Sequence, residues 1–203
     1  ACLKRQVSEG WNGAVCFGID EAYNMLKGVI DDIVEGINSS SALLLGASGT
    51  GKTMALNRIL DEQREELLDP DHLVVIELSG LLHNEPRIAC EEILFQITGE
   101  IPNVSSFDEA GEIVQETLKK AEESFIIILD NLDLFATLQR AKQSLLYFLF
   151  DLIHQSDINL GVIGTTTRLD CISLLEKRVI SRFSQIQIHF YPPDKLIQYL
   201  LFI

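Results

Sequence analysis

Basic residues, paired cysteines and long apolar runs are all scarce in this sequence. Its 16 Lys and Arg stand against 30 Asp and Glu, so the formal net charge over 203 residues is −14. Proteins bind nucleic-acid phosphates through clustered Lys and Arg. This acidic segment is therefore not expected to bind DNA through its net charge. The longest apolar runs, 125–129 and 145–150, fall far short of the ~20 residues of a membrane span. Since no cleavable signal precedes them, the expected setting is cytosolic or nuclear.

The cysteines and histidines form no metal-binding or redox pattern. No C-x-x-C pair is present, and no histidine accompanies a cysteine at ligand spacing. The residues are Cys2, Cys16, Cys90, Cys171, His72, His83, His154 and His189. Zinc sites need closely spaced ligands, so reduced and mostly buried thiols are expected rather than disulfides or zinc ligands.

Residues 46–53 read Gly-Ala-Ser-Gly-Thr-Gly-Lys-Thr, which is a complete phosphate-binding loop. An apolar run precedes it at 42–45 and a helical pattern follows at 54–60, as a strand–loop–helix unit requires. Its three glycines allow φ > 0 and a close approach of backbone N–H groups to a triphosphate. Lys52 is expected to reach the β- and γ-phosphates and Thr53 to bind Mg²⁺, beside the positive end of the helix dipole.

The predicted ligands are therefore ATP and Mg²⁺. The residues predicted to bind them in this loop are Gly46, Ala47, Ser48, Gly49, Thr50, Gly51, Lys52 and Thr53. The alternative is a glycine-rich turn that carries a surface lysine.

Helix-like and strand-like patterns alternate along the chain, whose length and 47% hydrophobic content suit one compact domain. We expect helices at 20–36, 52–67, 86–97, 108–123 and 138–153, and strands at 42–45, 73–78, 125–129, 160–164 and 186–188. Strands separated by helices predict an α/β fold, with a parallel five-stranded sheet and helices on both faces.

The apolar strand at 125–129 leads into Asp130, Asn131, Leu132 and Asp133. An acidic residue at the tip of such a strand lies beside the phosphate loop and completes the Mg²⁺ shell, usually through water, so Asp130 is the candidate. Asn131 follows, where a second carboxylate would polarise the attacking water; an amide can hydrogen-bond this water but cannot accept its proton. Tight binding with slow hydrolysis is expected. The alternative is that Asp130 only begins a turn and caps the next helix.

Two longer segments resemble the origin recognition complex subunit 4 family, whose members have the AAA+ ATPase fold. Residues 128–136 read Ile-Leu-Asp-Asn-Leu-Asp-Leu-Phe-Ala, and residues 162–184 contain Leu-Leu-Glu-Lys-Arg-Val-Ile-Ser-Arg-Phe; the segments 16–18 and 80–82 fit as well. The resemblance implies a P-loop AAA+ three-layer sandwich over residues 1–192. Residues 193–203 would then begin a truncated helical lid, the rest of which is missing.

The resemblance also assigns further site residues. Phe17 and Gly18 match the linker that contacts adenine, and residues 165–167 fall at the sensor position, with Thr167 as the predicted sensor of the γ-phosphate. Arg182 matches an arginine finger presented to the nucleotide of subunit 1, with Arg178 as its helper. Such an arginine neutralises charge that develops on the transferred phosphoryl group. The alternative for Arg182 is a surface ion pair.

The function implied by the resemblance is that of an ATP-binding subunit of the hetero-oligomeric origin recognition complex, in the nucleus. In DNA replication it would bind origin DNA as part of the assembly, help load the replicative helicase in the pre-replicative complex, and donate Arg182 to a neighbour. The partners would be the other subunits, subunit 1 above all, and no membrane. Its own ATPase activity is left open by Asn131. Two alternatives remain: a self-sufficient AAA+ ATPase that uses another acid, such as Asp133, or a regulatory signalling switch ATPase.

Overall fold

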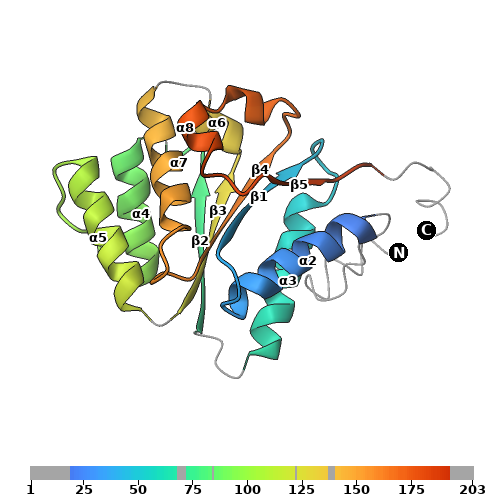
Figure 1. Cartoon of the computed structure of the whole chain (residues 1–203), viewed down its shortest axis with the longest axis horizontal. Coiled ribbons are helices and arrows are strands. Elements are labelled where there is room, and N and C mark those ends of the chain that lie inside the picture. The colour runs from blue at the N-terminus through green and yellow to red at the C-terminus, as the bar shows by residue number, and fades with distance from the viewer. Residues whose placement is uncertain (1–18, 68–71, 84, 122, 137–139, 193–203) are drawn as a thin grey trace.

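The computed structural model describes residues 19–67, 72–83, 85–121, 123–136 and 140–192 (Figure 1). Five strands form one parallel sheet in the order β2-β3-β4-β1-β5. The strands are β1 (Ser40–Leu45), β2 (Leu73–Ser79), β3 (Ser124–Asp130), β4 (Leu160–Thr166) and β5 (Ile186–His189). The predicted parallel five-stranded sheet is confirmed, and the strands extend slightly beyond their predicted ends.

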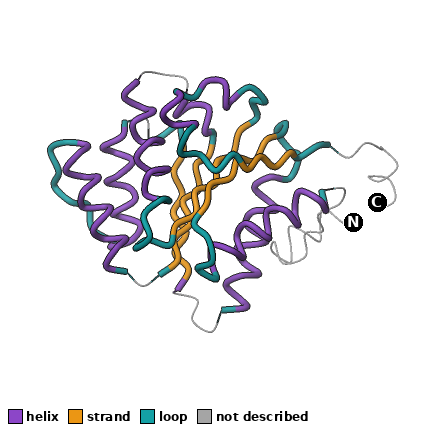
Figure 2. Tube along the Cα trace, viewed as in Figure 1, coloured by secondary structure: helices purple, strands orange, loops and turns teal. Residues whose placement is uncertain are grey.

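Helices cover both faces of this sheet and make three layers, which Figure 2 shows as purple helices around orange strands. On one face lie α2 (Asp20–Val34) and α3 (Lys52–Glu66). On the other lie α4 (Pro86–Thr98) and α7 (Arg140–Leu152), with α5 (Phe107–Lys120) beside α4. Because successive strand residues point to opposite faces, the buried side chains form two separate clusters, one under each layer of helices. The predicted three-layer sandwich is confirmed.

Three short helical segments were not predicted. They are α6 (Leu132–Ala136), the 3₁₀-helix η3 (Cys171–Leu174) and α8 (Lys177–Ile180). Each has five residues or fewer, too few for the recurrence at positions i, i+3 and i+4 on which helix prediction depends. All three follow strand ends, α6 after β3 and the other two after β4, so they determine what surrounds the carboxyl edge of the sheet.

The side chain of Gln96 covers part of the sheet edge formed by β2. Its amide oxygen accepts a hydrogen bond from the Glu77 N–H (2.9 Å), and its Nε2 donates to the Glu77 carbonyl oxygen (2.9 Å). A neighbouring strand would make the same two bonds. The outward-facing backbone groups of Glu77 are thus satisfied by one side chain from α4.

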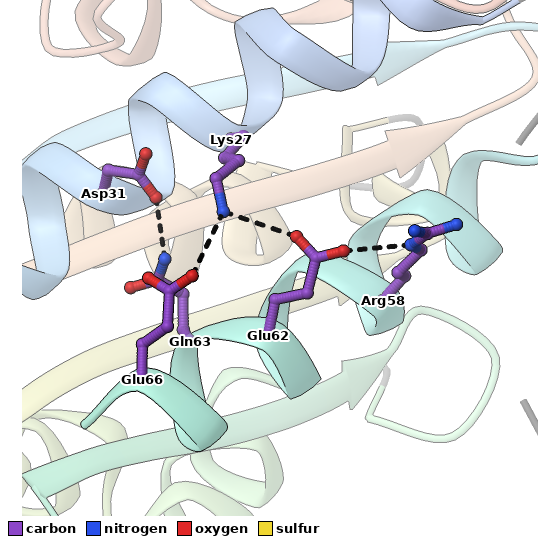
Figure 3. Close-up of polar contacts among 6 residues, drawn as sticks. All are labelled: Lys27, Asp31, Arg58, Glu62, Gln63 and Glu66. Carbon is purple, nitrogen blue, oxygen red and sulfur yellow. Dashed lines mark hydrogen bonds and ion pairs between the residues drawn. The ribbon is translucent and has the colours of Figure 1, made fainter. Parts of the chain in front are cut away.

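Polar side chains also connect α2 to α3 (Figure 3). Lys27 Nζ lies 3.3 Å from Glu62 Oε2 and 4.0 Å from Glu66 Oε1. Beside this pair, Gln63 Nε2 donates a 2.8 Å hydrogen bond to Asp31 Oδ1. These contacts hold the helix that follows the phosphate loop against the helix that precedes β1.

We expect Asp31→Asn to stabilise the domain at neutral pH by ~0.5 kcal/mol. Burial raises the pKa of Asp31 above its ordinary value of 3.8; the positive charge of Lys27 opposes this shift, and the carboxylate of Glu66 adds to it. A carboxyl group with a raised folded-state pKa binds its proton more tightly in the folded state, so the free energy of unfolding falls as the pH rises through that pKa. Asparagine keeps an oxygen for Gln63 and carries no charge.

Urea unfolding measures this effect. The gain should be full at pH 7 and shrink as the pH is lowered toward the ordinary value of 3.8. Asp32→Asn, on the same helix turn but exposed, is the matched control. A variant at Asp31 that is less stable than the wild type at pH 7 would contradict the expectation.

Candidate nucleotide-binding site

The loop between β1 and α3 has the backbone conformation that a phosphate-binding loop needs. Gly49 and Gly51 have φ values of 80° and 92°, which glycine adopts without the strain that a Cβ brings. At Gly46, a Cβ would clash with the carbonyl oxygen of Phe190. These three glycines are therefore required by the loop and by the chain packed against it.

The tip of this loop is open to solvent. Ala47, Ser48 and Gly49 are exposed, whereas Thr50 is buried and its Oγ1 donates a 2.9 Å hydrogen bond to the Ala47 carbonyl oxygen. The bond stabilises the turn from inside. The exposed backbone of residues 47–49 is the part that an anion can approach.

Lys52 and Thr53 form the first turn of α3. Lys52 is 9% exposed, and its Nζ donates to the carbonyl oxygens of Gly46 (2.7 Å) and Ala47 (2.9 Å). Burial lowers the pKa of Lys52, and the nearby carboxylate of Asp130 opposes that shift. Thr53 is exposed at the helix N-terminus, where free N–H groups and the helix dipole favour anions. The Lys52 ammonium group and the Thr53 hydroxyl thus both belong to the first turn of α3.

Asp130 ends β3 at the same edge of the sheet, because parallel strands carry their carboxyl ends to one side. Its carboxylate is held by two hydrogen bonds. Thr165 Oγ1 donates to Oδ1 (2.7 Å) and Asn131 Nδ2 donates to Oδ2 (2.9 Å). The negative charge of Asp130 opposes the effect of burial on the pKa of Lys52.

Asn131 adopts a left-handed backbone conformation, with φ of 56°. Asparagine tolerates this conformation better than most residues with a Cβ. Its side-chain amide is directed at Asp130. The residue predicted to replace a catalytic acid thus has two local roles, in the turn and at the carboxylate.

The predicted sensor segment sends its threonines in different directions. Thr165 is 5% exposed and bonds to Asp130, whereas Thr166 Oγ1 donates to Asp133 Oδ1 (2.7 Å) from the opposite face of β4. Thr167 lies exposed just after the strand ends. The Thr165 contact was missed, because alternation along the strand separates Thr165 from Thr166 but does not show which of them faces Asp130. Thr167 stays a prediction.

The predicted arginines follow β4 in the chain, Arg178 within α8 and Arg182 two residues after its end, and both side chains pack against Tyr147 of α7. Arg182 Nε bonds to Asp151 Oδ1 (2.5 Å), and its guanidinium carbon lies 4.4 Å from the centroid of the Tyr147 ring. Arg178 lies 5.6 Å from the same centroid and bonds to Glu176 Oε2 (2.7 Å). The hydrogen bond that Arg182 donates to the Asp151 carboxylate raises the pKa of Arg182. Sequence reasoning missed Tyr147 and Asp151, whose spacing of four residues on one helix face was the available signal.

The segment that carries both arginines packs on the face of the sheet opposite to α3. Val179 and Phe183, which flank Arg182, are buried in the cluster under α4 and α7, whereas α3 packs in the cluster on the other face. Figure 1 shows α8 beside α6 and α7, away from α3. The predicted arginine segment and the helix that follows the phosphate loop thus pack on opposite faces of the sheet.

A pocket of about 290 Å³ lies between the start of α2 and the end of β5. Its walls include Ile19, Ala22, Met25, Ile188, His189 and Tyr191. Ile19 also borders the phosphate loop, because its Cδ1 would lie 3.3 Å from a Cβ on Gly51. The predicted adenine contacts Phe17 and Gly18, and the predicted lid residues 193–203, lie outside the described residues.

The thiols that the structure describes match their prediction. Cys90 and Cys171 are free and buried, and burial raises their pKa to about 12 and about 11. Within the described ranges, no group of three or more His, Cys, Asp or Glu is arranged to hold a metal ion. Among the same residues, no helix has the length and apolarity to cross a membrane.

Residues 42–191 match the family model described as "ATPase family associated with various cellular activities (AAA)". The chain belongs to this AAA ATPase family. The match begins within β1 and ends just after β5, so it contains the phosphate loop, Asp130 and Arg182 of the AAA domain.

Curated relatives of this AAA domain are named origin recognition complex subunit 4. The Homo sapiens protein is 38% identical over an alignment of 194 residues that covers 91% of this chain and 44% of that protein. The Schizosaccharomyces pombe protein is 30% identical, over 89% of this chain and 20% of that protein. The resemblance predicted from the sequence is confirmed. The chain spans less than half the length of these relatives.

Solved structures share the AAA fold. The Aeropyrum pernix ORC1 protein in complex with DNA superposes with a TM-score of 0.74 at 22% identity, over 92% of this chain and 48% of that chain. A chain of Drosophila ORC bound to DNA gives a TM-score of 0.69 at 18% identity, over 88% and 43%. At these identities the likeness establishes the fold of the domain and not its function.

Proposed function

We propose that this AAA domain binds ATP together with Mg²⁺ at the loop between β1 and α3. The observation that carries the proposal is the glycine loop that leads into the buried Lys52, at the same edge of the sheet as the Asp130 carboxylate, which Thr165 fixes by a hydrogen bond. Lys52 would hold the β- and γ-phosphates, and Thr53 and Asp130 would hold the metal, Asp130 partly through water. A bound Mg²⁺ would neutralise phosphate charge. The backbone of residues 46–51 would wrap the phosphates.

The nucleobase is proposed to lie in the pocket between α2 and β5. Ile19 connects this pocket to the phosphate loop, since it borders both. The apolar side chains of Ala22, Met25 and Ile188 offer a surface on which a flat base can pack. Phe17 and Gly18, which directly precede Ile19, remain the proposed adenine contacts from the linker.

Slow hydrolysis by this chain is part of the proposal. Asn131 cannot accept a proton from water, and its amide is directed at Asp130. The carboxylate of Asp133 accepts a hydrogen bond from Thr166, on the α6 side of β4. The domain would therefore sense ATP more than consume it, and the reading as a self-sufficient ATPase loses support.

Arg182 is proposed to act in trans, at the nucleotide of the neighbouring subunit 1, with Arg178 as helper. The separation of α8 from α3 supports this role, because Val179 and Phe183, near Arg182, are buried on the face of the sheet opposite to α3. The relatives named origin recognition complex subunit 4 support a hetero-oligomeric complex as the setting. Within it, the protein would act in the nucleus, bind origin DNA through the assembly and help load the replicative helicase. We assign residues 1–192 to the AAA domain and 193–203 to the start of a lid.

A titration of the full chain, in its complex, with ATP and ATP plus Mg²⁺ tests nucleotide binding. We expect Mg²⁺ to tighten binding by ~10-fold, since the metal joins phosphate oxygens to Thr53 and Asp130. Asp130→Asn removes the charge that the metal needs and should abolish this metal dependence. Equal affinity with and without Mg²⁺ in the wild type would contradict the proposed metal ligands.

The sensor residue can be identified by two matched substitutions. Thr165→Val keeps the shape of the side chain but removes the hydrogen bond to Asp130, and we expect it to weaken Mg²⁺–ATP binding by ~10-fold, as for a lost bond to a charged group. Thr167→Val should change the affinity by less than about twofold, because Thr167 is exposed. Fluorescence titration with a labelled ATP analogue measures both. The reverse order of effects would make Thr167 the sensor, as the sequence predicted.

A further inference from the structure

Gln143 is a buried polar residue that joins three separate segments of the chain. It lies on α7 and is 7% exposed. Its Nε2 donates hydrogen bonds to the carbonyl oxygens of Ala136 (2.8 Å) and Leu174 (3.0 Å), and its Oε1 accepts one from the Glu176 N–H (2.7 Å). Both amide donors and one acceptor site are therefore used.

The hydrogen-bond partners of Gln143 lie at the ends of short helices, close in sequence to Asp130 or to the arginines. Ala136 ends α6, the helix that follows Asp130 and Asn131. Leu174 ends η3, and Glu176 is the residue directly before α8. Gln143 thus fixes the start of α8 to the end of the segment that follows the acidic strand tip.

Gln143 also lies on the same face of α7 as the two residues that contact the Arg182 side chain. Gln143, Tyr147 and Asp151 are spaced by four residues, so they lie along one face of α7. Tyr147 and Asp151 contact the Arg182 guanidinium, while Gln143 holds the backbone where α8 begins. One helix face therefore fixes the arginine-bearing segment at both ends.

We propose that Gln143 is a positioning residue for Arg182. The inference rests on the proposed function, in which Arg182 acts at a neighbour's nucleotide. A finger must meet the transferred phosphoryl group within a fraction of an ångström, and a misplacement of ~1 Å can cost ~100-fold in rate. Arg182 has a long, flexible side chain, so its reach is defined only if the backbone of α8 is fixed.

The test uses the complete complex that contains the full-length chain. Gln143→Met keeps the length and volume of the side chain and removes all three hydrogen bonds. We expect it to lower kcat for ATP at the neighbouring site by ~10-fold while KM stays within about twofold, because a displaced finger affects the transition state and not substrate binding. In an Arg182→Ala background, Gln143→Met should cause no further loss, because its effect runs through Arg182.

The control is the buried Gln63, which is 6% exposed and bonds to Asp31 on the other face of the sheet (Figure 3). Gln63→Met also removes a buried glutamine bond and should leave the neighbour's kcat within about twofold of the wild type. Complex assembly and the melting temperature are recorded for every variant. If Gln143→Met does not assemble, Gln143→Asn replaces it: this variant keeps an uncharged amide on a side chain too short to reach all three partners, and a loss of about threefold in kcat is expected.

The possible results distinguish a failure of the positioning role of Gln143 from a failure of the proposed role of Arg182. If Arg182→Ala leaves turnover unchanged, the proposed role of Arg182 fails. If Arg182→Ala abolishes turnover and the assembled Gln143 variant keeps full kcat, only the positioning role fails. That role also fails if the Gln143 variant raises KM in place of lowering kcat, or lowers the residual turnover of Arg182→Ala further.

Discussion

Arg182→Ala in the assembled complex is expected to lower ATP turnover at the neighbouring subunit's site by ~10³-fold or more. The loss is expected because the guanidinium would neutralise the negative charge that develops on the transferred phosphoryl group. The ion pair with Asp151 does not prevent this role: both side chains are partly exposed, at 33% and 43%, and such pairs contribute only ~0–1 kcal/mol. Arg182 can therefore exchange the carboxylate for a phosphate at small cost.

Steady-state turnover of the reconstituted complex measures the effect. Lys177→Ala removes another exposed cation of α8 and serves as the control, with turnover expected to stay near the wild-type value. Binding of ATP by the Arg182 variant's own loop should also be unchanged, because α8 and α3 lie on opposite faces of the sheet. Full turnover without Arg182 would refute action in trans.

Lys52→Ala should remove the thermal stabilisation that Mg²⁺–ATP gives to the wild-type protein. A ligand that binds only the folded state at 100 times its Kd adds ~2.7 kcal/mol of stability, which raises Tm by roughly 5–10 °C in a domain of this size. Lys52 supplies the ammonium group expected to contact the β- and γ-phosphates. Without it we expect affinity to fall by at least ~100-fold, as for a lost buried charge pair.

Differential scanning fluorimetry, with and without Mg²⁺–ATP, checks this result. Each variant is compared with its own ligand-free Tm, because Lys52 also bonds to the carbonyl oxygens of Gly46 and Ala47 and its loss changes the stability of the free protein. Arg58→Ala, which removes an exposed cation from the middle of the same helix, is the control and should keep the full ligand shift. An undiminished shift in Lys52→Ala would remove the basis of the nucleotide site.

Local sequence patterns were sufficient for the sheet and for the position of the glycine loop between β1 and α3. The glycines and Lys52 are consecutive in the chain, so their spacing alone defines the loop. The continuous apolar run of β3 indicates a strand buried on both faces, and Asp130 follows it directly. Each of these features depends on neighbours within a few residues.

Contacts between distant segments could not be predicted in the same way. The bond between Thr165 and Asp130 depends on the register of β4 against β3, and three successive threonines gave no local reason to prefer one. Gln143 meets its partner Glu176 across 33 residues of sequence. Tyr147 and Asp151 looked like ordinary residues of an amphipathic helix until the fold brought Arg182 against them.

The amide of Gln96 limits how this domain can join other proteins. An open strand edge carries unpaired backbone groups with which another chain can pair, and such pairing commonly leads to aggregation. Since Gln96 occupies both outward-facing backbone groups of Glu77, β2 offers no continuous template for an added strand. Neighbours are thereby directed away from this edge, toward surfaces where recognition depends on side chains and is selective. A glutamine far from any nucleotide thus helps to decide which contacts the protein does not make.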